Sequence, residues 1–132
     1  MGTTIKLAAV GAVAFMVLDG VWLGLLMKNF YREKLGPIVR LADGGIAPNW
    51  PAALVVYVLL GAGIALFVIP RASTVASAAA FGALFGLVVY GVYDFTNYST
   101  LRQWPFVLTL ADTVWGALAS AAAAVAVRML DR

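Results

Sequence analysis

Four long apolar stretches constrain this chain more than any other feature. They cover approximately residues 4–27, 51–69, 74–96 and 105–128. A helix of about 20 residues crosses the roughly 30 Å hydrocarbon core of a bilayer. Because lipid offers no hydrogen bonds to the backbone, helices are the structure expected of such stretches. The sequence therefore predicts an all-α membrane protein, a four-transmembrane-helix antiparallel bundle in which residues 1–132 form a single domain.

The composition excludes several classes of protein. Hydrophobic residues make up 64% of the chain and charged residues only 11%, against roughly 25% charged residues in soluble domains. Cysteine and histidine are absent, which removes disulfides, thiolate chemistry and the commonest general base and metal ligand. The net charge of +3 comes without a basic stripe, so we expect no nucleic acid partner. We expect no cofactor and no metal site.

The connections between the stretches differ in length. Trp50-Pro51 and Trp104-Pro105 are typical of helix starts at a membrane interface. Residues 28–50 form one long connection, in which Gly36-Pro37 breaks any continuing helix. The connection after Pro70 is very short, so we expect the second and third helices to be antiparallel neighbours. The positive charges divide almost evenly between the two ends of the bundle, so they do not orient it in the membrane.

Three carboxylates lie in or beside the apolar stretches, at Asp19, Asp94 and Asp112. Asp19 precedes Lys28 by nine residues and Asp112 follows Trp104 by eight, which places each about 12 to 13 Å below the same membrane face. Asp94 lies closer to that face. Polar groups at such depth are costly in lipid, so they are expected to point into the bundle or to serve a function.

The neighbours of the acids support an inward orientation. Trp22 and Trp115 each follow an aspartate by three residues, a spacing that places both on one helix face. In the third helix one stripe combines small and polar residues, namely Gly82, Gly86, Tyr90, Asp94 and Asn97, and in the fourth helix Thr109, Asp112, Gly116 and Ala119 form another. Small residues allow close helix contact. We interpret the Gly82–Gly86 and Gly20–Gly24 pairs as packing within the chain.

No basic residue lies deep in any stretch to neutralise the acids. Neighbouring carboxylates cannot all stay charged cheaply in a low dielectric. Four arrangements remain: a carboxylate is protonated, Arg102 or Lys28 folds inward, a cation binds, or water fills a cavity. Asp19 and Asp112 are the candidate catalytic pair. The candidate substrate-binding residues are Trp22, Tyr90, Asp94, Asn97, Tyr98, Arg102 and Trp115.

With these residues assembled, the chain resembles the DUF2177 family of small predicted bacterial membrane proteins. The resemblance rests on residues 18–24 (LDGVWLG), 30–31 (FY), 93–101 (YDFTNYSTL), 104–105 (WP) and 112–116 (DTVWG). It covers nearly the whole chain. The resemblance implies a multi-pass location in the bacterial inner membrane and this set of candidate residues, and it implies no particular reaction.

Three functions fit the pattern. The first is a non-catalytic accessory or scaffold for another membrane component, in which the acids hold helices together. The second is a membrane enzyme in which Asp19 and Asp112 divide acid and base roles on a lipid or lipid-linked substrate. The third is a proton- or cation-binding transport component, which would need an oligomer. Expected partners are therefore the bilayer, a lipid substrate or another membrane protein, and further copies of the chain.

Overall fold

The computed structural model describes residues 2–42 and 45–131, and it is helical almost throughout. Its four longest helical segments run over Gly2–Leu26, Trp50–Arg71, Val75–Thr100 and Phe106–Leu130, and each is long and apolar enough to cross a membrane. The predicted all-α bundle of four membrane helices is confirmed. The observed helix ends lie within a few residues of the expected ones.

Two of these segments are not α-helical along their whole length. The first consists of α1 (Gly2–Val21) and a π-helical turn, η1 (Trp22–Leu26). The second consists of α3 (Trp50–Gly63), the π-helical η3 (Ile64–Val68) and the 3-10 turn η4 (Ile69–Arg71). The third and fourth are the uninterrupted helices α4 (Val75–Thr100) and α5 (Phe106–Leu130). A π-turn widens the helix, and it changes the direction of the side chains that follow.

The long connection is more structured than its sequence indicates. Lys28–Leu35 form a helix, α2, which ends at the expected Gly36-Pro37 break and is followed by the 3-10 turn η2 (Gly36–Ile38). The turn expected at Asp43-Gly44 lies outside the described residues. A short antiparallel pair follows, β1 (Leu41–Ala42) with β2 (Gly45–Ile46). Tyr31 of α2 is buried against the bundle, and the helix ends at Gly36, whose φ of 49° suits glycine.

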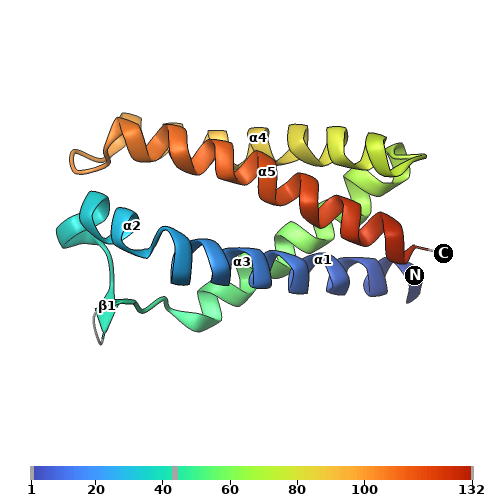
Figure 1. The fold of residues 1–132 in the computed structure, drawn as a ribbon, viewed down its shortest axis with the longest axis horizontal. Helices are drawn as coiled ribbons and strands as arrows, with labels where there is room; N and C mark the ends of the chain where they lie inside the picture. Colours follow the sequence, from blue (N-terminus) through green and yellow to red (C-terminus); the bar gives the residue numbers. More distant parts are fainter. Residues whose placement is uncertain (1, 43–44, 132) are drawn as a thin grey trace.

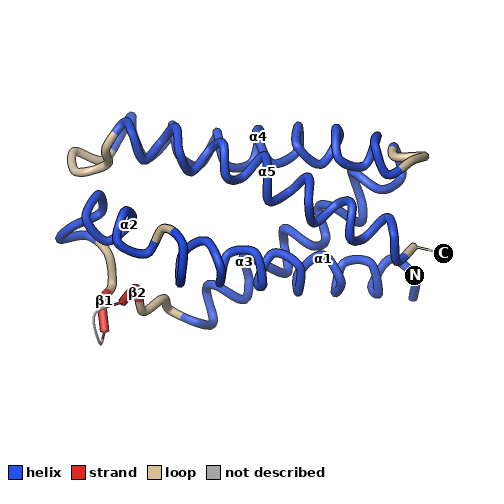
Figure 2. Tube along the Cα trace, viewed as in Figure 1, coloured by secondary structure: helices blue, strands red, loops and turns tan. Residues whose placement is uncertain are grey.

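The helices associate as two pairs. In Figure 1, α4 and α5 lie together above α1 and α3, and both chain ends lie at one end of the molecule. Figure 2 shows the α4–α5 loop and the β1–β2 region at the opposite end. Helix α3 packs along α1, and the second segment contacts α4 chiefly through η3 and η4. The expected neighbour relation between the second and third membrane helices therefore holds near their connection, and the two diverge from there.

Small residues determine this pairing. A methyl group on Gly61 of α3 would overlap the backbone of α1 at Ala8 and Ala12, and one on Gly86 of α4 would overlap the carbonyl oxygen of Gly116 in α5. The interpretation of Gly82–Gly86 as packing within the chain is confirmed, because Gly82 lies against Ala124 and Ser120 of α5. Such close approach allows dispersion contact between backbones in lipid, where no hydrophobic force drives helices together.

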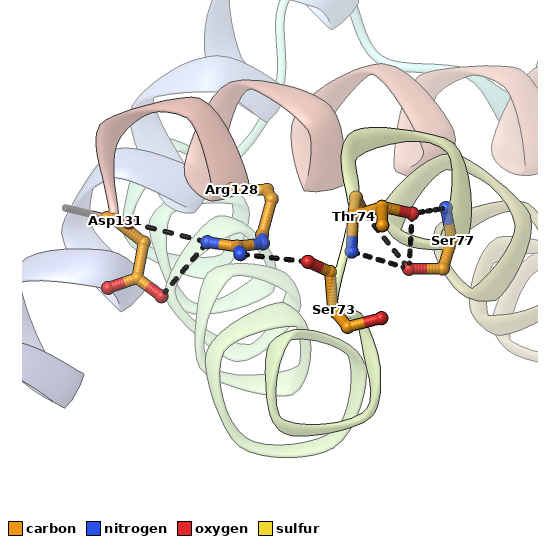
Figure 3. A network of polar contacts seen from close by, with 5 residues as sticks. All are labelled: Ser73, Thr74, Ser77, Arg128 and Asp131. Atoms are coloured by element: carbon orange, nitrogen blue, oxygen red, sulfur yellow. Dashed lines mark hydrogen bonds and ion pairs between the residues drawn. The ribbon is translucent and has the colours of Figure 1, made fainter.

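Polar contacts fix the end of the bundle where the chain termini lie. Thr74 and Ser77 form a reciprocal capping box at the start of α4. Arg128 of α5 donates to the carbonyl oxygen of Ser73 at 3.0 Å and lies 3.9 Å from a carboxylate oxygen of Asp131 (Figure 3). These contacts tie the end of α5 to the connection between η4 and α4. The candidate residues lie in the other half of the bundle.

Candidate functional site

Asp19 joins three of the four membrane segments. It lies near the end of α1 and is 9% exposed. Its carboxylate accepts a hydrogen bond from the indole Nε1–H of Trp115 in α5 and another from the hydroxyl of Tyr57 in α3, both at 2.9 Å. Hydrogen bonds to a charged acceptor are among the stronger ones in proteins. Asp19 therefore holds α1, α3 and α5 in register.

Asp112 receives its hydrogen bond from outside the membrane segments. The hydroxyl of Tyr31 in α2 donates to Asp112 at 2.6 Å and accepts from the indole Nε1–H of Trp22 at 2.9 Å. Burial raises the pKa of Tyr31, and the negative charge of Asp112 raises it further. Tyr31 therefore keeps its proton and remains a donor across the physiological pH range.

The two tryptophans connect these two hydrogen-bonded groups. The rings of Trp22 and Trp115 stack with their centroids 4.3 Å apart and their planes 1° from parallel. The expectation that both pack beside the acids rather than in lipid is confirmed. The hydrogen bonds cross over, however. Trp115 donates to Asp19 on the other helix, and Trp22 reaches Asp112 through Tyr31, so neither indole N–H binds the aspartate three residues before it.

Asp94 is the most deeply buried of the three acids. It is 0% exposed, and one of its carboxylate oxygens accepts from Thr113 at 3.3 Å. The other, Oδ1, has no hydrogen-bond donor among the described residues. Asp94 also interacts electrostatically with Asp112, the residue before Thr113. The arrangement brings all three candidate acids to one half of the bundle.

A cavity reaches both members of the candidate pair. It has a volume of ≈ 330 Å³ and is lined by Asp19, Asp112, Trp115 and Tyr90, together with Leu23, Val56, Leu60, Val89 and Tyr93. Val56 of α3 is 51% exposed and Val89 of α4 is 37% exposed. Because Val56 and Val89 lie on the diverging helices α3 and α4, the apolar rim of the cavity is exposed between these two helices. We name it the lateral cavity.

A second cavity also reaches Asp19, between α1, β2 and the start of α3. It has a volume of ≈ 440 Å³, and its lining includes Tyr57, Lys28 and Trp50. Gly20 and Gly24 line it too, and neither has an atom within 4 Å of where a Cβ would lie. The interpretation of that glycine pair as packing within the chain is wrong, because both glycines face the open space of this cavity. Lys28 shares this cavity with Asp19 but forms no ion pair with it within the described part of the chain.

The remaining candidates lie elsewhere. Asn97 and Arg102 line a third cavity at the ends of α4 and α5, together with Tyr93. Tyr98 is 46% exposed, and its ring packs against Phe106 at a centroid distance of 5.2 Å. It is not among the residues that line these three cavities. The candidate set therefore divides into an interior group around the lateral cavity, a polar group at the helix ends, and Tyr98 on the outer surface.

The family model for DUF2177, described as a predicted membrane protein, matches residues 4–129. The chain belongs to this family. No curated protein and no solved structure matches it. Membership of DUF2177 agrees with the four apolar helices, and the chain is a small integral membrane protein that crosses the bilayer several times.

Sequence reasoning missed two residues of this candidate site, Tyr31 and Tyr57. Tyr57 is the one hydroxyl-bearing residue in the apolar stretch 51–69, a signal that could have found it. Tyr31 lies in a connecting segment, and only folding of α2 brings it to Asp112. Within the described residues, 2–42 and 45–131, no group of three or more His, Cys, Asp or Glu side chains gathers closely enough to hold a metal ion.

Proposed function

We propose that this protein binds an amphipathic molecule with a cationic amine head, which enters the lateral cavity from the bilayer. The observation that carries the proposal is the joint lining of that cavity by Asp19, Asp112 and apolar residues of the diverging α3 and α4. Its polar end suits a head group, and its apolar, exposed rim suits a hydrocarbon chain. Pockets of this size with few, well-placed polar groups are typical of small-molecule sites.

The charge of the head group follows from the residues around the cavity. Its lining contains two carboxylates and no Lys or Arg. A carboxylate in a low dielectric gains most from a partner of opposite charge. The Trp115 ring, stacked on Trp22, adds an aromatic face of the kind that attracts ammonium groups. An amine is therefore favoured over a carboxylate or a sulfate.

Amphiphiles of equal chain length provide a direct test. The protein in phosphatidylcholine nanodiscs is titrated with dodecylamine, dodecanol and dodecanoate while tryptophan emission is recorded. We expect saturable binding of dodecylamine and at least about tenfold weaker binding to the Asp19→Asn and Asp112→Asn variants, the usual scale for losing a charge-assisted contact. The Asp131→Asn variant is the matched control, since Asp131 lies at the other end. Equal responses to all three amphiphiles would overturn the proposal.

A catalytic version of the same site is the second candidate. Asp19 accepts from an indole and a tyrosine, whereas Asp112 accepts from a single tyrosine and lies beside Asp94. Unlike surroundings are the means by which two carboxylates take separate acid and base roles. Chemical conversion of a bound amphiphile, followed by mass spectrometry and lost in Asp112→Asn, would favour the enzyme over the binding protein.

The other hypotheses lead to different results. If the acids only hold helices together in a scaffold, Asp19→Asn and Asp112→Asn should destabilise the fold, and neither should change the binding of an amphiphile. A metal-cation carrier has less support, because no metal-binding group of side chains gathers in the described residues.

As part of the proposal we assign the protein to the bacterial inner membrane, since helical multi-pass proteins occupy that membrane and barrels the outer one.

A further inference from the structure

The third cavity lies where α4 ends and α5 begins, and its chemistry is opposite to that of the lateral cavity. It has a volume of ≈ 650 Å³ and is lined by Ile38, Tyr93, Asn97, Leu101, Arg102, Gln103 and Trp104. No Asp or Glu is among these residues. Arg102 supplies a positive charge, and the side chains of Asn97, Gln103 and Trp104 supply N–H donors.

Two of these donors lack an internal acceptor. The indole Nε1–H of Trp104 is buried without a hydrogen-bond partner in the part of the chain that the structure describes. Leaving a buried donor unpaired is costly, and such groups are normally satisfied by protein, water or a ligand. The Trp104 ring is held in place by an edge contact with Tyr93 at a centroid distance of 5.9 Å. Arg102 forms no ion pair with any described residue.

The position of the cavity indicates what it meets. It lies at the ends of two membrane-spanning helices, where the polar headgroups of a bilayer begin. Phosphate is the anionic group of that layer, and it offers several acceptor oxygens to converging donors. An Arg guanidinium matches phosphate geometry with paired N–H groups. A phosphate would also provide the acceptor that Trp104 lacks.

We propose that the cavity formed by Asn97, Arg102, Gln103 and Trp104 binds a phosphate group. The Arg102 guanidinium pairs with its charge, and the Trp104 indole and the two amides donate to its oxygens. This inference goes beyond the amine site. The two sites share the wall residue Tyr93 but have opposite charge preferences.

Native mass spectrometry of the detergent-solubilised protein tests the proposal. The probes are dioleoyl phosphatidic acid, dioleoylglycerol, which is the same lipid without the phosphate, and inorganic phosphate as a competitor. We expect phosphatidic acid to bind and dioleoylglycerol not to. Arg102→Gln and Trp104→Phe should each weaken phosphatidic acid binding roughly tenfold, since each removes a donor to a charged group. Trp104→Phe keeps the aromatic edge contact with Tyr93.

Arg71→Gln is the matched control. Arg71 is an exposed arginine near the other membrane face, where it donates to the carbonyl oxygen of Phe67, and we expect its variant to bind phosphatidic acid as the wild type does. Displacement of the lipid by millimolar inorganic phosphate would identify the ligand as phosphate in general, and failure to displace it would identify a lipid phosphate. Equal binding of phosphatidic acid and dioleoylglycerol, or undiminished binding by folded Arg102→Gln, would overturn the proposal.

Discussion

At the scale of single residues, the candidate acids are organised by aromatic donors. Asp19 is held by Trp115 and Tyr57, and Asp112 by Tyr31. A carboxylate that accepts such bonds is positioned without a basic partner, which leaves it available to the cationic head group proposed above. This differs from a buried ion pair, in which the two charges satisfy each other.

The hydroxyl of Tyr31 links Asp112 to Trp22. Tyr31→Phe removes the donor to Asp112 and the acceptor for Trp22 without changing the ring. We expect a loss of about 1 to 3 kcal/mol in the free energy of unfolding, the range for a hydrogen bond to a charged group. Denaturant unfolding in detergent measures it. Tyr98→Phe, which removes an exposed hydroxyl, is the control and should stay within about 0.5 kcal/mol of wild type.

The stability difference between wild type and Tyr31→Phe should also depend on pH. The folded-state pKa of Tyr31 is raised above its ordinary value of 10.0 by burial and by Asp112. Its contribution to stability is therefore complete below pH 10 and is lost as the pH rises further, because the unfolded state releases the proton first. We expect the stability difference between wild type and Tyr31→Phe to be constant from pH 7 to 9 and to shrink above 10. A difference that grows in alkaline solution would contradict this assignment.

At the scale of elements, close helix contact separates the structural glycines from the others. Gly86 faces the carbonyl oxygen of Gly116, which cannot move without shifting α5. Gly20 has open space where a side chain would begin, and it borders the cavity between α1 and α3. The sequence does not distinguish these glycines, because both belong to pairs with the same spacing.

Alanine substitution distinguishes them. Gly86→Ala should destabilise the protein by about 1 to 3 kcal/mol through overpacking against α5. Gly20→Ala should be neutral or slightly stabilising, since alanine is the better helix former by roughly 1 kcal/mol. Thermal unfolding in detergent compares the two variants directly. Equal losses from both would indicate that the pairing of α4 with α5 is incorrect.

How far the sequence determines this structure depends on the element. The four membrane helices follow from apolar length alone, and the Trp-Pro pairs mark two of their starts. The position of Tyr31 does not follow, because it depends on a contact between residues 81 positions apart. Helical spacing correctly places Trp22 and Trp115 beside the acids, but it cannot reveal that their hydrogen bonds cross to the other helix. The divergence of α3 from α4 depends likewise on packing that no local pattern encodes.

At the scale of the whole molecule, both chain ends lie at one end of the bundle and the cavities around the acids lie toward the other. The native chain has no cysteine, so single-cysteine variants label cleanly. Ser73→Cys and Asp131→Cys should react with a membrane-impermeant maleimide from one face, and Glu33→Cys and Gln103→Cys from the other. Labelling of Glu33→Cys and Gln103→Cys from opposite faces would contradict the bundle.

We propose that Asp19 and Asp112 form a binding site in the lateral cavity and do not merely join helices. The most direct test is the shift in Tm that dodecylamine causes in wild type and in Asp112→Asn. A ligand that binds the folded state at 100 times its Kd stabilises it by about 2.7 kcal/mol, so wild type should show a clear rise. The variant should fold, with a Tm lowered by no more than that of Tyr31→Phe because asparagine still accepts from Tyr31, and show no rise. An Asp112→Asn protein that fails to fold, or one that gains as much stability from dodecylamine as wild type does, would contradict the claim.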